Sequence, residues 1–167
     1  MTRVDAHYKV PFRRRRTGQT DYRRRLRLLV GHRSRAVVRK TLSNMIVQIV
    51  AYSPAGDRIV ATAVSKELTK LGWSAGTGNT PAAYLTGYLA GKRAMKAGVS
   101  EAVLDIGLHA PSRGSRVYAS LRGLIDAGMR VPHASEVLPG DDRIRGVHIN
   151  AEVPKAFDSV RAKLEGI

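Results

Sequence analysis

The side chains with the clearest chemistry are the arginines and lysines near the N-terminus. The first 40 residues contain 14 Lys and Arg but only two acids, so this segment has a charge of +12. The whole chain has +16, which leaves only +4 on the other 127 residues. Guanidinium groups bind phosphate oxygens through paired hydrogen bonds and also stack on bases. A charge block this dense is typical of tails that bind nucleic acid, and it favours that function over a merely solvated tail.

Aromatic residues interrupt the basic arm, as RNA recognition often requires, because unpaired bases stack on aromatic rings. Tyr22 is assigned to core packing instead, since it shares a helical stripe with Leu26, Leu29 and Val30. The predicted RNA-contacting residues of the arm and the segments after it are Tyr8, Lys9, Phe12, Arg13, Arg14, Arg15, Arg16, Arg23, Arg24, Arg27, Arg33, Arg35, Arg39 and Lys40.

Two turns add candidate contacts, each with a simpler structural interpretation. Ser43 and Asn44 form a short turn that either touches RNA or, as the pattern alone favours, is an ordinary hairpin turn. The glycine-rich segment 76–81 opens a helix, where free backbone N–H groups can bind a phosphate and Asn79 is the candidate contact. It lacks the spacing of a dinucleotide or P-loop motif, so a plain loop is favoured over a nucleotide site.

A third loop, residues 109–116, follows a predicted buried strand and precedes a helix. It supplies His109, Arg113 and Arg116 as further candidate RNA contacts, since loops at strand ends often have functional roles. A lone histidine is more often structural than catalytic. Ser112 and Ser115 have no evident activating partner, so nucleophilic catalysis is not predicted.

Metal chemistry and catalysis find little support in the sequence. The chain has no Cys, and its five His lack ligand spacing. The pair Asp141-Asp142 is interpreted as a polar loop with internal ion pairs. The alternative function is a metal-dependent nuclease, which would need Asp57, Asp105 and Asp126 to converge. We predict no catalytic residue, metal or cofactor. The chain has no apolar run long enough to span a bilayer and no secretory signal, so no membrane partner is expected, and the absence of Cys fits a cytoplasmic protein.

Secondary structure signals divide the chain into an arm and a domain. Residues 1–19 lack apolar periodicity and predict an extended arm. Thr20, as N-cap, begins a helix whose apolar stripe packs while its arginines stay exposed. Three β-rich runs, 35–42, 45–52 and 58–65, are joined by short turns and therefore form an antiparallel meander.

The second half of the chain is mainly helical. A short helix is predicted over residues 65–71. A second helix, capped by Thr80, runs to about residue 97 and contains small residues that allow close packing. A buried strand at 101–106 and a helix at 115–127 follow. The resulting fold class is α/β, a two-layer mixed sheet in which a crossover strand joins the meander. The predicted regions are an arm at 1–19, a globular domain at 20–130 and a C-terminal extension with a short helix at 131–167.

Several segments together resemble one protein family. The sequence resembles the archaeal and eukaryotic branch of large-subunit ribosomal protein eighteen, the 5S-rRNA-binding family, from about residue 7 to residue 149. The matching segments are Tyr8 to Arg16, Thr20 to Tyr22, Arg25-Leu26, Arg39-Lys40, Gln48-Ile49, Leu71 to Trp73, Ala83 to Gly87, Leu104 to His109, Arg113 to Val117 and Arg143 to Gly146.

This resemblance implies a structural role in the central protuberance of the large ribosomal subunit. Family members use the basic arm and first helix on rRNA and the sheet region against 5S rRNA. The implied partners are 5S rRNA, large-subunit rRNA and neighbouring proteins of the central protuberance, including the family numbered five. The implied location is the large ribosomal subunit in the cytoplasm. The charge distribution independently favours an RNA partner.

Overall fold

A four-stranded mixed sheet lies at the centre of the fold, in a computed structural model that describes residues 7–166. Strands β1 (Arg35–Lys40), β2 (Met45–Ala51) and β3 (Arg58–Val64) form the antiparallel meander. Strand β4 (Val103–Asp105) pairs in parallel with β1, which gives the order β3-β2-β1-β4. The predicted meander and crossover strand are confirmed. The prediction of a fully buried fourth strand is wrong, because β4 is a half-buried edge strand.

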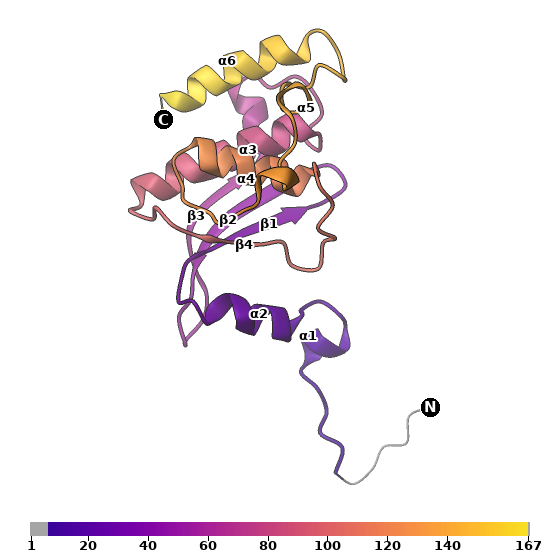
Figure 1. Cartoon of the computed structure of the whole chain (residues 1–167), viewed down its shortest axis with the longest axis vertical. Coiled ribbons are helices and arrows are strands. Elements are labelled where there is room, and N and C mark those ends of the chain that lie inside the picture. Colours follow the sequence, from indigo (N-terminus) through magenta and orange to yellow (C-terminus); the bar gives the residue numbers. More distant parts are fainter. Residues whose placement is uncertain (1–6, 167) are drawn as a thin grey trace.

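Helices cover one face of this sheet. After the 3-10 helix η1 (Ser65–Leu71), helix α3 (Thr80–Lys96) forms the crossover from β3 to β4, and α4 (Arg116–Asp126) packs against it. Helix α6 (Val153–Glu165) also packs on α3, and Figure 1 shows these three helices above the sheet. The fold is therefore the predicted two-layer α/β arrangement. Within the described range 7–166, no helix is both long and apolar enough to cross a bilayer.

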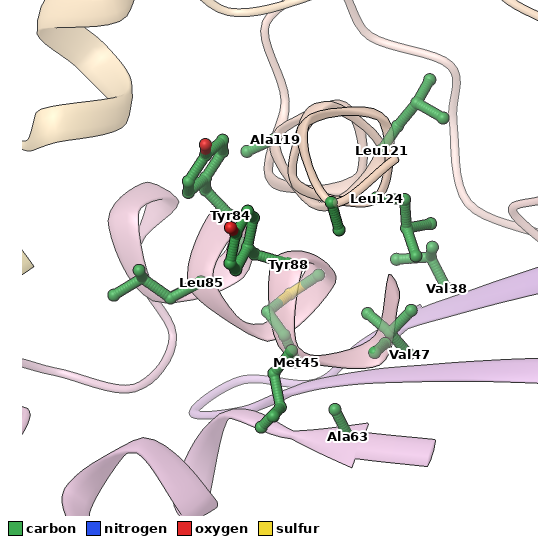
Figure 2. Packing of buried hydrophobic residues seen from close by; sticks show 14 of the residues in the cluster. Val38, Met45, Val47, Ala63, Tyr84, Leu85, Tyr88, Ala119, Leu121 and Leu124 are labelled. Carbon is green, nitrogen blue, oxygen red and sulfur yellow. The ribbon is translucent and has the colours of Figure 1, made fainter. Parts of the chain in front are cut away.

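The core lies between the sheet and α3, and Figure 2 shows its packing. Val38 and Val47 on neighbouring strands point toward the helical layer, and Leu124 of α4 lies beside Val38. Tyr84 and Tyr88, one helical turn apart on α3, stack with ring centroids 6.4 Å apart. Trp73 is also buried, and its Nε1 donates to the Gly76 carbonyl at 3.2 Å.

Helices α3 and α4 cross with their backbones in direct contact. A methyl group added to Gly87 would overlap the Ser120 carbonyl, and one added to Gly123 would overlap the Tyr84 carbonyl. The Ser120 hydroxyl donates across the crossing to the Ala83 carbonyl at 2.9 Å. The small residues predicted to allow close approach therefore serve a helix–helix contact.

The C-terminal segment joins the same core. Helix α6 buries Phe157, Val160 and Leu164 against it. Between the short 3-10 helix η2 (Ser135–Val137) and α6 lies α5 (Asp141–Arg145), which the sequence pattern did not predict. The expectation of a loop with internal ion pairs is wrong at residues 141–145: Asp141 lies in the first turn of α5 and pairs with Arg122 of α4.

Two helix caps lie one residue away from their predicted positions. Asn79, not Thr80, caps α3, because its Oδ1 accepts a hydrogen bond from the Ala82 N–H at 2.8 Å. Likewise Asp21, not Thr20, caps α2 (Tyr22–Leu29) by accepting from two backbone N–H groups. Asp and Asn are at least as good N-caps as Thr, so Asp21 and Asn79 cap these helices in place of the adjacent threonines.

Candidate nucleic-acid interface

The basic N-terminal part of the chain contains two short helices that lie apart from the sheet, one in the arm and one just after it. Residues 13–16 form one helical turn, α1 (Arg13–Arg16), with all four arginines exposed, a turn that the prediction of an extended arm did not include. Phe12 is 75% exposed and its ring lies 5.7 Å from that of Tyr22. Figure 1 shows α1 and α2 below the sheet, opposite the helical layer. The first six residues of the predicted arm lie outside the described range.

Helix α2 stands off the domain instead of packing by an apolar stripe. Leu26 and Val30, two members of the predicted stripe, are 66% and 69% exposed, so that part of the prediction is wrong. The helix is held mainly by polar contacts: Nη1 of Arg24 donates to the Gly107 carbonyl at 2.7 Å, and Nη2 of Arg25 contacts both oxygens of Asp57. Arg23 and Arg27 remain exposed, as predicted.

Arg35 is the residue whose placement differs most from its predicted role. Only 3% of it is exposed, and its guanidinium donates to Asp57 at 2.7 Å and to Asp105 at 2.8 Å. A buried cation needs such partners, because desolvation would otherwise destabilise it. Arg35 therefore links the β2–β3 turn to the end of β4, and we leave it out of the RNA-contacting set.

Asp57 lies at the centre of this ionic network. Partial burial disfavours its charged form, but hydrogen bonds from Arg25 and Arg35 outweigh that effect and lower the pKa of the carboxyl. The carboxylate is thus ionised at neutral pH and binds two arginines from different elements. The network fixes the position of α2, and with it the direction in which the arm leaves the domain.

A groove of about 540 Å³ separates the arm from the sheet, and we call it the arm groove. Its walls are segment 19–25, strand β1 and the segment 105–109 that follows β4. Arg39 of β1 and Arg14 of α1 both line it. Asp21, Asp57 and Asp105 also line the groove, but the arginines outnumber them, and the resulting excess of positive charge suits a polyanion.

His109 connects the end of β4 with the end of β1. Its Nε2 accepts a hydrogen bond from the Lys40 N–H at 3.2 Å, which assigns the proton to Nδ1. Partial burial, followed by the positive charges of Lys40, Arg39 and Arg116, lowers the pKa of the imidazole. His109 is therefore neutral at pH 7 and has the structural role that its isolation in the sequence suggested.

Several of the remaining candidate residues lie at the end of the molecule where β1 meets β2. Ser43 and Asn44 lie in the hairpin turn 41–44, which is two residues longer than predicted, and the carbonyl of Ser43 accepts from Thr77 Oγ1 at 2.6 Å. Arg116 donates to the Gly78 carbonyl at 2.6 Å, while the exposed Arg113 pairs loosely with Glu136 at 3.3 Å. The structure places further candidates as follows: Tyr8, Lys9 and Arg33 exposed, Lys40 half-buried at the end of β1, and Asn79 half-buried at the start of α3.

The carboxylates considered for a nuclease do not assemble a metal site. Asp57 and Asp105 do converge, but on the guanidinium of Arg35. Asp126 lies on α4, where it accepts a hydrogen bond from the Tyr84 hydroxyl at 2.6 Å. Within residues 7–166, no three His, Asp or Glu side chains are grouped so that they could hold a metal ion. The arrangement therefore gives the nuclease alternative no support.

Comparison with known proteins identifies the family. The family model described as "Ribosomal large subunit proteins 60S L5, and 50S L18" matches residues 6–101 and 96–134. The chain belongs to this family. It is 58% identical to the large ribosomal subunit protein uL18 of Korarchaeum cryptofilum over 142 residues, which covers 85% of this chain and 73% of that protein. It is 51% identical to the uL18 of Methanococcoides burtonii over 162 residues, covering 94% of each.

A third relative, the uL18 of Methanothermobacter thermautotrophicus, is 56% identical over 142 residues, which covers 85% of this chain and 74% of that protein. The resemblance predicted from separate short segments is thus confirmed over most of the chain. Membership of the uL18 family makes this chain a protein of the large ribosomal subunit. Its excess of positive charge, concentrated before residue 40, fits a location among ribosomal RNA.

Sequence reasoning missed three residues that lie close to the candidate contacts. Arg25 belongs to the arginine-rich helix, but its role as a tether depends on Asp57, which is 32 residues away. Arg143 and His148 lie beside Lys40 and Arg116 only because the C-terminal segment folds back over α3. Neither position has a local pattern that distinguishes it from ordinary polar surface.

Proposed function

We propose that this uL18-family protein binds 5S rRNA and anchors it in the central protuberance of the large ribosomal subunit. The observation that supports this most directly is the set of exposed arginines on α1 and α2, held away from the sheet across the arm groove. Phosphate contacts provide affinity but little sequence information, so the arm serves mainly for attachment.

The folded domain would set the register of the RNA. Arg39 and Lys40 at the end of β1 and the hairpin turn at Ser43 and Asn44 lie together at one end of the sheet. His109 is hydrogen-bonded to the backbone of Lys40, so its loop is fixed relative to the same end. A rigid surface of this kind can recognise the shape of a folded RNA, which a flexible basic tail alone cannot.

The proposed role is structural, with no catalytic step. Its further proposed partners are large-subunit rRNA and neighbouring central-protuberance proteins, including the family numbered five. The cationic surfaces support the RNA partners, because a charge of +16 on 167 residues needs neutralisation in a compact assembly. The protein partner rests on the family resemblance.

A binding titration with 5S rRNA tests the proposal. Transfer RNA and duplex DNA serve as competitors, and the titration is repeated at several salt concentrations. We expect a preference for 5S rRNA that persists as salt rises, because shape recognition depends less on counterion release than phosphate contact does. Equal binding to all three nucleic acids, lost steeply with salt, would contradict recognition by the folded domain.

A matched pair of variants tests the role of the arm. In one variant Arg13, Arg14, Arg15 and Arg16 are replaced by Gln. In the control, four exposed lysines elsewhere are replaced by Gln, which lowers the net charge equally; they are Lys66, Lys70, Lys96 and Lys155. Each lost phosphate contact reduces the slope of log K against log salt by about 0.7 to 0.9. With four contacts removed, the slope of the arm variant should be smaller than that of the wild type by about 3. A similar loss in the control would assign binding to net charge alone.

A further inference from the structure

A second cationic cavity, of about 600 Å³, lies where helices α3, α4 and α5 meet the end of β1. The described residues that line it include the cations Lys40, Arg116 and Arg143, together with His148, and no carboxylate. It shares no lining residue with the arm groove. Three like charges around one cavity repel one another, so an anion inside it would relieve that repulsion.

The first turn of α4 opens into this cavity. Ser115 is its N-cap residue, but the side chain makes no capping hydrogen bond. Its Oγ is buried and has no hydrogen-bond partner among the described residues. A serine at this position normally accepts from the second or third N–H of its helix, and a buried hydroxyl without a partner is destabilising. The N–H groups of this turn are thus available to a ligand that accepts hydrogen bonds, and the buried hydroxyl would reach such a ligand by rotation about the Cα–Cβ bond.

The cavity walls are fixed to one another before any ligand arrives. Arg116 donates to the Gly78 carbonyl at 2.6 Å, which joins the start of α4 to the loop before α3. That loop is packed on the β1–β2 hairpin, because a Cβ on Gly78 would lie 3.0 Å from the Leu42 carbonyl oxygen. Thr77 reinforces the contact by its hydrogen bond to the Ser43 carbonyl. A preformed site loses less entropy on binding than a flexible one.

We propose that this cavity binds a single phosphate group, and that in the assembled protein this is a backbone phosphate of ribosomal RNA. Helix N-termini bind phosphate through free N–H groups, and arginine and lysine complete the charge balance. Arg143 and the Ser115 hydroxyl are the residues assigned to the ligand, while Arg116 mainly positions the loops. The RNA part of this proposal rests on the proposed function, whereas phosphate binding as such does not.

Inorganic phosphate tests the site in the full-length protein without RNA. We expect phosphate to shift the backbone amide NMR signals of Arg116 and Val117, and chloride at equal ionic strength to leave them unchanged. Ser115→Ala separates a ligand role from a structural one. Because the hydroxyl has no partner, Ser115→Ala should keep or raise the Tm while weakening phosphate binding. A lowered Tm with unchanged phosphate binding would overturn the assignment.

A 5S rRNA titration distinguishes an RNA phosphate from free phosphate. Arg143→Gln should lower RNA affinity about tenfold, because one charge-assisted hydrogen bond is lost. It should also reduce the slope of log K against log salt by about 1. Arg145→Gln is the control, since Arg145 lies on the same short helix but lines a different cavity. If phosphate shifts the amide NMR signals but Arg143→Gln binds 5S rRNA as tightly as the wild type does, the ligand is not an RNA phosphate. If phosphate causes no shift and RNA affinity is also unchanged, the site itself is overturned. If wild-type protein fails to bind 5S rRNA, the phosphate titration still decides whether the site exists.

Discussion

Nη2 of Arg25 lies 2.9 and 2.8 Å from the two carboxylate oxygens of Asp57, and this contact joins an exposed helix to a turn of the sheet. The same carboxylate binds the buried Arg35, which also binds Asp105 at the end of β4. One network of two acids and two arginines thus fixes α2, the β2–β3 turn and the sheet edge relative to one another. Replacing the partly exposed Arg25 should therefore lower the stability of the domain much less than replacing the buried Arg35.

Arg25→Gln should release α2 without unfolding the domain. The Arg25 and Asp57 side chains are 31% and 29% exposed, so solvent screens their attraction and the global stability should fall by less than about 1 kcal/mol. Hydrogen exchange of the α2 amides should become much faster, while that of the sheet stays unchanged. Arg27→Gln on the same helix is the control, because Arg27 is exposed. Equal protection of α2 in both variants would show that the tether contributes nothing.

Arg35→Leu should destabilise the whole domain. It leaves Asp57 and Asp105 without the buried cation between them, and breaking a buried pair from one side costs about 3 kcal/mol or more. Arg39→Leu on the same strand is the control, and it should change stability by less than about 0.5 kcal/mol because Arg39 is exposed. Urea unfolding followed by circular dichroism measures both.

A double variant separates lost charge balance from lost packing in that experiment. If the cost in Arg35→Leu comes from unpaired carboxylates, Arg35→Leu combined with Asp105→Leu should recover part of the stability. A double variant that is less stable by the sum of both single losses would point to packing of the Arg35 side chain instead.

The elements of the fold were predictable because their signals are local. Short turns between β-rich runs require antiparallel neighbours, and the stripe Val117, Leu121 and Leu124 fixes the buried face of α4. The apolar stripe of α2 has the same spacing, yet Leu26 and Val30 are exposed. Periodicity shows which face of a helix is apolar, but it does not show whether the rest of the chain covers that face.

The composition of the interface was predictable only in part. A run of arginines predicts phosphate contact wherever it folds, so the arm needed no tertiary information. The burial of Arg35 depends on two acids 22 and 70 residues away along the chain. Arg143 reaches the cavity at the start of α4 only because α5 folds against α3. Contacts over such sequence distances leave no periodic pattern.

Gly87→Ala should unfold or strongly destabilise the protein. A methyl group there would overlap the Ser120 carbonyl at the crossing of α3 and α4, and neither backbone can move without disturbing the core. The expected loss is about 3 kcal/mol, opposite in sign to the gain that alanine normally brings inside a helix. Gly31→Ala is the control, because a Cβ there has no heavy atom within 4 Å. Thermal unfolding compares the two, and similar Tm values would contradict the close crossing.

His109 should make stability depend on pH in the weakly acidic range. Its folded-state pKa lies below the ordinary value of 6.5, so as pH falls the unfolded chain takes up a proton before the folded one does. Stability from this group is therefore complete above about pH 6.5 and is lost as pH falls through the lower folded-state pKa. Protonation of Nε2 would also break the hydrogen bond from the Lys40 N–H.

Unfolding measurements between pH 7.5 and pH 5 test this dependence. His109→Gln should flatten it, because glutamine does not titrate and its amide oxygen can still accept a hydrogen bond. His133→Gln is the matched control: His133 is exposed, and its ring forms a hydrogen bond with the carbonyl of the nearby Val131. An unchanged pH profile in His109→Gln, or an equal flattening in His133→Gln, would show that another group titrates. The lowered pKa keeps the His109 imidazole neutral at pH 7, so its Nε2 continues to accept the hydrogen bond from the Lys40 N–H of β1.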